Sequence, residues 1–277
     1  IVEENDEVRE VFGKNIFSNR QLSFAPSANL PTPVNYRLGP GDEVIIDIWG
    51  TNQATIRQTI SPEGYINIAD IGLVNLNGMT VKEADSYMRR KLGQIYAVDG
   101  EDASSEIKLT LGNIRTIQVN VMGEVKVPGT YAMSSFSNML HAIYRAGGVN
   151  ELGTLREIKL FRNGKLKASA DLYEFMMDGN APDEITLEEG DLIIVSPYKN
   201  LVDIDGSVKR PMAYELKEGE TVRDLLDYAG GFAGDAYKSN IRVVRQNGAE
   251  YQVFTVETPQ YDEFVMMDGD LVTVGTM

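Results

Sequence analysis

The chain has 277 residues, 43% of them hydrophobic, a formal net charge of −15, no cysteine and one histidine. This composition suits two or three folded domains, excludes disulfides, thiolate zinc sites and a cysteine nucleophile, and disfavours nucleic-acid binding, which needs clustered lysine and arginine. No apolar run approaches the roughly 18 residues of a membrane-spanning helix. The sequence opens with "IVEEND", without Met or a charged-then-apolar leader, so we expect a fragment or a processed product.

Residues 1–35 predict an extended lead-in, because asparagine, serine and proline interrupt every periodic pattern there. Two short apolar pieces, "VREVF" and "QLSF", are expected to add edge strands to later domains.

The segment 36–117 predicts a first α+β unit. The period-two run "EVIIDIW" predicts a strand with one apolar face, and "PEG" at 62–64 predicts a turn between two short strands. Thr80 and Glu83 form a capping box for a helix, which Gly93 is expected to end. "IKLTL" and "IQVNVMG" predict two further strands. The apolar positions of the first strand and the helix are Val44, Ile46, Ile48, Val81, Ala84, Met88 and Leu92.

The rest of the chain contains an internal repeat, which is the strongest signal in the sequence. "VNVMGEVKVPGTYAM" from Val119 aligns with "VDIDGSVKRPMAYEL" from Val202 at a constant offset of 83 residues. One residue is then inserted, and the later Gly190-Asp191 aligns with Gly269-Asp270 at an offset of 79. We therefore predict two homologous modules. Matched positions at the offset of 83 include Gly123/Gly206, Pro128/Pro211, Tyr131/Tyr214, Gly147-Gly148/Gly230-Gly231, Ile158/Ile241 and Arg162/Arg245.

Each module is expected to run strand, Gly turn, strand, short helix, Gly-Gly, hairpin and final strand. Asn138 and Thr221 are the predicted N-caps of the helices, and Gly147 and Gly230 end them in the left-handed region. The Asn-Gly pairs suit type I′ hairpins. Each Gly-Asp predicts a tight turn, with the Asp bonding nearby amides, into a strand whose "LIIV" is expected to be covered on both faces.

Residues with chemical potential are few. His141 is expected to be a solvated helix residue, because a lone histidine makes no metal site. Carboxylates such as those in 188–191 recur in turns, so the sequence does not predict a glycosidase pair across a cleft. We expect no catalytic residue, no metal and no cofactor. Trp49 lies on the strand face opposite Ile48, so it is expected to be partly exposed and is a candidate for glycan or subunit contact.

"YRLGPGDEVIIDIWG" followed by "SPEGYINIADIGLVNLNGMTVKEA" resembles the polysaccharide export domain of Wza-type outer-membrane exporters. The two repeats resemble the soluble-ligand-binding β-grasp (SLBB) modules that follow it in that family. A small departure is Ala69-Asp70, where the family often has a proline before its Ile-Gly. The matching positions are Tyr36, Leu38-Gly39, Gly41-Asp42, Gly64, Ile66, Ile71-Gly72, Gly78 and Thr80.

The resemblance implies an α+β chain of three small domains in tandem, the last two β-grasp-like. After the lead-in 1–35, the expected limits are 36–117 for the export domain and 118–198 and 199–277 for the two modules. The residues expected to carry the structural motifs are Gly41, Asp42, Gly64, Gly72, Gly123, Pro128, Gly147, Gly148, Gly190, Asp191, Gly206, Pro211, Gly230, Gly231, Gly269 and Asp270.

The resemblance also implies a non-catalytic conduit for capsular polysaccharide or exopolysaccharide, in the periplasm and associated with the outer membrane. The expected partners are the polysaccharide, further copies of the chain in a ring homo-oligomer, and an inner-membrane co-polymerase or export component. Family members are commonly lipoproteins, but this sequence lacks the acylated cysteine. One alternative stays open: a monomeric periplasmic module that binds a soluble glycan or small ligand.

Overall fold

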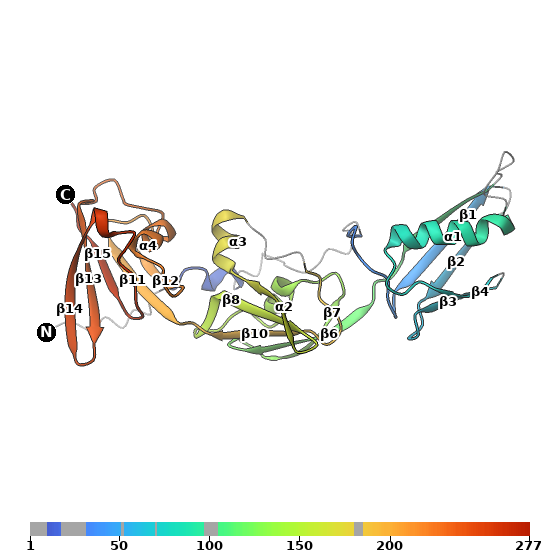
Figure 1. Cartoon of the computed structure of the whole chain (residues 1–277), viewed down its shortest axis with the longest axis horizontal. Helices are drawn as coiled ribbons and strands as arrows, with labels where there is room; N and C mark the ends of the chain where they lie inside the picture. The colour runs from blue at the N-terminus through green and yellow to red at the C-terminus, as the bar shows by residue number, and fades with distance from the viewer. Residues whose placement is uncertain (1–9, 18–31, 51–52, 70, 97–104, 180–184) are drawn as a thin grey trace.

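The computed structural model describes residues 10–17, 32–50, 53–69, 71–96, 105–179 and 185–277. These residues form three α+β units that stand in a row along the longest axis of the molecule (Figure 1), which confirms the predicted fold class. Among the described residues, no helix combines the length and the apolar character needed to cross a lipid bilayer.

The first unit is a three-stranded antiparallel sheet of order β2-β1-β5, packed against one helix and a separate two-stranded hairpin. Alternation along β1 turns its apolar side chains toward the helix, as predicted, and these side chains share one core with the helix. The elements are β1 (Glu43–Gly50), β2 (Ala54–Thr59), β3 (Tyr65–Ile68), β4 (Gly72–Asn75), α1 (Val81–Tyr96) and β5 (Ser105–Leu111). The core side chains of β1 and α1 are Val44, Ile46, Ile48, Ala84, Met88 and Leu92.

Helix α1 begins as predicted and ends later than predicted. The backbone N–H of Thr80 donates to the Glu83 carboxylate at 2.8 Å, and the Glu83 N–H donates to the Thr80 hydroxyl at 3.2 Å. Gly93 does not end the helix, which continues to Tyr96. A glycine inside a helix costs about 1 kcal/mol relative to alanine, and the packing of the Tyr96 ring against the core offsets this cost.

The two modules share one topology. The first module has sheet order β7-β6-β10-β8-β9 and the second β12-β11-β15-β13-β14, so equivalent strands hold equivalent places in two separate sheets. In each module the final strand runs parallel to the first strand and antiparallel to the third. The first module contains β6 (Thr116–Gly123), β7 (Gly129–Ser134), α2 (Met139–Arg145), β8 (Gly153–Arg162), β9 (Lys165–Ala170), α3 (Leu172–Asp178) and β10 (Leu192–Pro197). The second contains β11 (Asn200–Gly206), β12 (Met212–Leu216), α4 (Val222–Tyr228), β13 (Asn240–Asn247), β14 (Glu250–Glu257), η2 (Thr258–Gln260) and β15 (Leu271–Val274).

The short helices α2 and α4 have the predicted ends. Asn138 and Thr221 are their N-caps, each in a capping box with the N3 residue. Gly147 and Gly230 follow the helices with φ of +82° and +80°, a conformation that a residue with a Cβ adopts at a cost.

Only one of the two Asn-Gly hairpins has the predicted type I′ turn. Asn163 and Gly164 both have positive φ, 52° and 74°, as that turn requires. In the second module Asn247 stays in β13 and pairs with Glu250, so the loop moves on to Gly248 and the residue after it. The inserted residue lengthens the strand and shifts the turn by one position.

Strand β10 is covered on one face only, so the prediction for "LIIV" is wrong for the other face. Ile193 and Val195 are buried, whereas Leu192 and Ile194 remain partly exposed. The buried pair belongs to the core of the module.

The described part of the lead-in, residues 10–17, contacts both modules. Val11 forms an isolated parallel bridge with Ala213 at the edge of β12. It is followed by η1 (Lys14–Phe17), whose Phe17 is buried in a core that continues from the first module into the second. "QLSF" and the first two residues of "VREVF" lie outside the described residues.

Candidate functional site

The three Gly-Asp pairs form the same turn. Asp42, Asp191 and Asp270 are each 0% exposed, and the glycine before each has positive φ. Each carboxylate accepts a hydrogen bond at 2.8–2.9 Å from the backbone N–H three residues earlier in the chain. The Asp therefore does bond a nearby amide, but the amide lies before the Asp and not after it as in an Asx turn.

Each buried carboxylate also binds an arginine. Arg162 makes two hydrogen bonds of 2.8 Å to Asp191, and Arg245 makes bonds of 2.8 and 2.7 Å to Asp270. Such bidentate pairs supply hydrogen bonds and an opposite charge to the carboxylate, which offsets the free-energy cost of removing it from water. The match of Arg162 with Arg245 in the internal repeat is the sequence signal for this contact.

The first Gly-Asp pair connects the first unit to the first module. Arg115 donates to Asp42 at 2.6 Å, and the hydroxyl of Tyr36 lies 2.7 Å from an Asp42 oxygen and 2.8 Å from the Ser135 hydroxyl. The rings of Tyr36 and Phe136 meet edge to face at 4.7 Å. Burial raises the pKa of Tyr36 well above its usual range, so the phenol stays protonated and can donate to Asp42.

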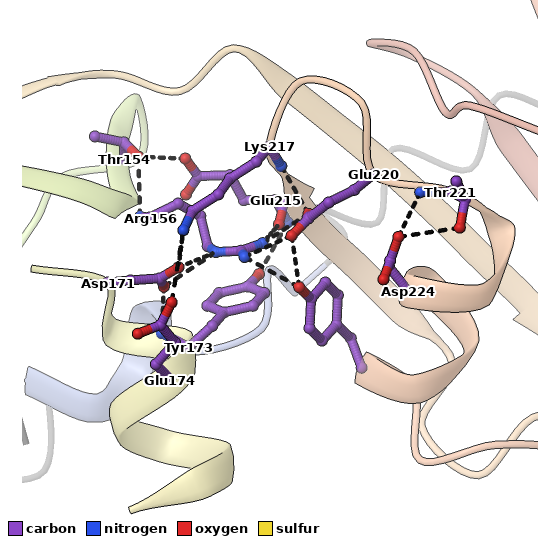
Figure 2. Close-up of polar contacts among 11 residues, drawn as sticks. Thr154, Arg156, Asp171, Tyr173, Glu174, Glu215, Lys217, Glu220, Thr221 and Asp224 are labelled. Carbon is purple, nitrogen blue, oxygen red and sulfur yellow. Dashed lines mark hydrogen bonds and ion pairs between the residues drawn. The ribbon is translucent and has the colours of Figure 1, made fainter. Parts of the chain in front are cut away.

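A second cluster connects the two modules (Figure 2). We call it the Arg156 joint, and it takes three residues from each module. The Arg156 guanidinium donates to the Asp171 carboxylate at 3.1 Å and to both Glu220 oxygens at 3.0 and 2.8 Å. It also donates to the Glu215 carbonyl oxygen at 2.9 Å and to the Tyr228 hydroxyl at 3.0 Å. The joint consists of Arg156, Asp171 and Tyr173 from the first module and Glu215, Glu220 and Tyr228 from the second.

The Arg156 side chain is only 5% exposed, and two carboxylates and two tyrosine rings compensate its charge. The guanidinium carbon lies 4.4 Å from the centre of the Tyr173 ring and 5.0 Å from that of the Tyr228 ring, distances typical of cation–π contacts. Burial would lower the pKa of Arg156, but Glu220 and Asp171 raise it well above its usual range. The Arg156 guanidinium therefore stays protonated between the modules, where the carboxylates of Asp171 and Glu220 balance its charge.

Glu215 adds a buried carboxylate to the same joint. Its side chain accepts hydrogen bonds from the Thr154 hydroxyl and, at 2.7 Å, from the Leu155 N–H, and its own N–H donates to the Tyr173 hydroxyl at 2.9 Å. Burial raises the pKa of Glu215, against the opposing effects of these two donors, Lys14 and Arg156. The cross-module bonds of Glu215 fix β12 to the start of β8.

The lead-in reinforces this joint. The Phe12 ring lies 5.2 Å from the Tyr173 ring of the first module and 5.4 Å from the Tyr214 ring of the second. The Lys14 ammonium donates to the carbonyl oxygens of Asn150 at 2.8 Å and Glu151 at 3.2 Å, and also to that of Gly153. Residues of both modules are therefore tied to one short segment.

Two open clefts of about 610 and 640 Å³ flank the Arg156 joint. Several of their charged side chains form ion pairs: Lys217 lies 2.6 Å from Asp171 and 3.7 Å from Glu174, and Lys159 lies 3.2 Å from Glu157. Lys217 thereby connects the wall of the clefts to Asp171 of the joint.

The other residues singled out in the sequence have structural roles. His141 is half-buried in the α2 capping box, where its Nδ1 accepts from the Asn138 N–H at 3.0 Å, so it is not the fully solvated residue that was expected. Burial lowers the pKa of His141.

The tyrosine hydroxyls of Tyr131 and Tyr214 each donate to the carbonyl oxygen four residues earlier. No group of three or more potential metal ligands occurs among the described residues.

The repeated glycines permit close contacts and turns. A Cβ at Gly123 or Gly206 would lie 2.1 Å from a backbone carbonyl oxygen of the final strand, so neither position accepts a side chain. The remaining motif glycines with positive φ are Gly41, Gly64, Gly72, Gly147, Gly148, Gly190, Gly230, Gly231 and Gly269. Pro128 and Pro211 directly precede β7 and β12.

Trp49 lies in the first unit. It follows Ile48 near the end of β1 and is 42% exposed. An open hollow of about 600 Å³ surrounds it, lined also by Asp47, Gln53 and Thr55. The period-two pattern predicted this exposure, but it gave no information on the polar neighbours from β2.

Comparisons with known families agree with this architecture. Residues 30–103 match the family described as polysaccharide biosynthesis/export protein, and residues 117–195 and 201–254 match two descriptions of the SLBB domain. The chain therefore carries a polysaccharide export domain followed by two SLBB domains.

Two kinds of curated protein are distant homologues of this chain. The polysialic acid transport protein KpsD of Escherichia coli is 23% identical over 268 residues, which are 96% of this chain and 46% of that protein. The EPS I polysaccharide export outer membrane protein EpsA of Ralstonia nicotianae is 25% identical over 281 residues, 91% of this chain and 71% of that protein. The chain spans about half the length of the KpsD proteins that it matches.

Proposed function

We propose that this chain is the periplasmic part of an outer-membrane export channel for capsular polysaccharide or exopolysaccharide, and that it acts as a non-catalytic conduit. The observation that carries the proposal is the order of an export domain and two SLBB domains, in a chain that aligns over 96% of its length with a polysialic acid transport protein.

The Arg156 joint supports a passive structural role. A conduit needs modules whose orientation does not drift while a polymer passes, and this chain places the buried Arg156–Glu220 ion pair between its two modules. Breaking a buried ion pair is costly because it leaves an uncompensated charge. The Arg156 joint therefore resists changes in the angle between the two modules.

The buried acids support a role without catalysis. The Gly-Asp carboxylates are fully buried and bonded to arginine, so they are not free to act as a general acid or base on a substrate. The proposal assigns the glycines and Asp residues of these motifs to the fold, and it reserves glycan or subunit contact for Trp49.

The proposal further includes assembly into a ring of identical chains and contact with an inner-membrane co-polymerase or export component. Two modules of the same sheet topology stand in a row along the molecule, an arrangement that suits repeated side-by-side contacts in a ring. Light scattering on the full-length protein tests the ring: a closed oligomer supports it, and a monomer at all concentrations favours the alternative of a monomeric glycan- or ligand-binding module.

The direct test of export uses the organism that carries the gene. Deletion of the gene is expected to reduce surface polysaccharide and to leave the polymer inside the cell, and the full-length gene is expected to restore export. Polysaccharide in the extracellular and cell-retained fractions is measured with a polymer-specific antibody. Unchanged surface polysaccharide in the deletion strain contradicts the proposal.

A further inference from the structure

The outer face of the β2-β1-β5 sheet contains an exposed tryptophan among polar side chains. The inner face of the sheet is apolar and faces α1. On the outer face, Asp47 pairs across the sheet with Thr55 of β2 and Lys108 of β5, and Trp49 pairs with Glu106. Among the described side chains of this face, the indole of Trp49 is the exposed large apolar group, whereas Ile45 is only partly exposed, and hydrogen-bonding groups border the indole.

This arrangement fits a sugar ring better than a protein partner. The carbon-bound hydrogens of a pyranose form an apolar face that packs on an aromatic ring, while its hydroxyl groups need polar partners around the edge. A protein interface core instead clusters several apolar side chains. The lining of the hollow around Trp49 supplies a carboxylate from Asp47, an amide from Gln53 and a hydroxyl from Thr55.

The polar groups are held in place. The Thr55 hydroxyl donates to Asp47 at 2.7 Å, which fixes one carboxylate oxygen and leaves further acceptor positions on that carboxylate. Asp47 and Thr55 both lie in paired strands, so these two polar groups have a rigid support.

The local charge indicates which sugars fit. Asp47 and Glu106 are carboxylates close to the indole in the sheet register. Of the cations on this face, Lys108 reaches toward Asp85 of α1 at 3.4 Å, and Arg57, which pairs with Ile45, lies on the far side of Asp47 from Trp49. The two carboxylates would repel an acidic sugar, because its charge has the same sign. The hydroxyl groups of a neutral sugar could instead donate hydrogen bonds to them.

We propose that this face, centred on Trp49 and Asp47, binds a neutral sugar residue of the exported polysaccharide. The inference rests on the proposed function for its ligand class. One platform and a few hydrogen bonds give weak affinity, with a Kd on the order of 1 mM. Weak binding suits a conduit, because the polymer must leave each contact in order to move on.

The single tryptophan of the chain makes the test direct, because intrinsic tryptophan fluorescence of the full chain reports only Trp49. Maltohexaose and N-acetylchitohexaose serve as neutral probes, and oligosialic acid and oligogalacturonate as acidic probes. We expect a saturable change in emission with at least one neutral probe, and at least about tenfold weaker binding of both acidic probes. No saturable change with any of the four probes, or stronger binding of an acidic probe, overturns the inference.

Variants identify the residues that bind. Calorimetric titration of Trp49→Ala and Asp47→Asn with the best neutral probe should show at least about tenfold weaker binding. Tyr251→Ala, which removes a 69% exposed aromatic side chain of the second module, should bind like the wild type. Unchanged melting temperatures show that the variants fold. Equal affinity in Trp49→Ala and the wild type overturns the site.

The export assay separates this inference from the proposed function. If the full-length gene restores export but the purified protein binds none of the probes, the sugar site is wrong and the export function stands. If the gene has no effect on export while Trp49 still binds a neutral probe, the export function is wrong and the sugar site stands.

Discussion

The two SLBB modules have the same fold but different neighbours, and the difference separates residues that build a module from residues that join modules. Arg162 and Arg245 occupy matched positions, and each binds the Gly-Asp carboxylate of its own module. Arg156, six residues before Arg162, has Ser239 at the matched position of the second module. The repeated arginine completes a module, and the unrepeated arginine connects one module to the next.

The other members of the Arg156 joint are also unrepeated. At the offset of 83, Glu215 matches Ala132 and Tyr228 matches Arg145. A duplicated gene begins with two identical copies, so residues that differ at a contact between the copies are those specialised for the contact. We therefore infer that the residues of the joint serve the contact between the modules and not the folding of either module.

The largest expected effect comes from the repeated carboxylates. Asp270→Ala should lower the free energy of unfolding of the affected module by about 3–5 kcal/mol, because it removes the carboxylate that pairs with the part-buried Arg245. Asp191→Ala should fall toward the lower end of this range, because Arg162 keeps its second ion pair with Glu188. Urea unfolding followed by circular dichroism measures the loss. Asp262→Ala is the matched control, since the Arg223–Asp262 pair is exposed and should contribute at most about 1 kcal/mol. A similar small loss in all three variants would show that the buried carboxylates contribute no more stability than an exposed ion pair.

The next effect comes from the unrepeated joint. Arg156→Met should lower the free energy of unfolding by about 2–3 kcal/mol, less than the Asp variants, because Asp171 keeps Lys217 at 2.6 Å and Glu220 keeps the Tyr228 hydroxyl at 2.6 Å. The loss should also uncouple the modules, so that one calorimetric transition becomes two. A single transition with wild-type stability would show that the joint does not couple the modules.

A pH dependence distinguishes the buried carboxylate of the joint. Burial raises the pKa of Glu215 above its ordinary value of 4.5, so the unfolded chain loses this proton at lower pH than the folded chain. The stabilising contribution of Glu215 is therefore full below about pH 4.5 and declines as the pH rises through the folded pKa. Glu215→Gln does not titrate, so the stability of the wild type relative to this variant should fall over that window. A pH-independent difference in urea-unfolding energies would contradict the assignment.

The smallest expected effect compares the two hairpins. Asn163 has a φ of 52°, so Asn163→Ala should cost about 1–2 kcal/mol. Asn247 lies within β13, so Asn247→Ala should change the free energy of unfolding by less than about 0.5 kcal/mol. Thermal unfolding of the two variants gives the comparison, and equal losses would show that the hairpins have the same turn after all.

Much of this architecture could be predicted because its signals are local or repeated. Capping boxes, Gly-Gly helix ends and the alternation that exposes Trp49 all lie within a few residues of the structure they specify. Two details differ from the prediction. Helix α1 continues past Gly93 to Tyr96, and the extra residue before Asn247 moves the second turn.

The Arg156 joint could not be predicted from the sequence. Its contacts join residues up to 72 positions apart, and none of its members lies in a motif or recurs in the repeat. Asp171 and Glu220 look like ordinary polar residues before short helices until the fold brings Arg156 between them. Only the tertiary structure supplies that information.

The central claim is that the unrepeated joint holds the two repeated modules in one orientation. The chain has no cysteine, so Lys165→Cys and Glu250→Cys, at exposed positions of the two modules, take spin labels specifically. Pulsed electron–electron double resonance measures the distance between the two spin labels. It should give one narrow distance distribution for the doubly labelled protein and a broad one after Arg156→Met. A broad distribution with Arg156 present, or equally narrow distributions with and without it, would contradict the claim.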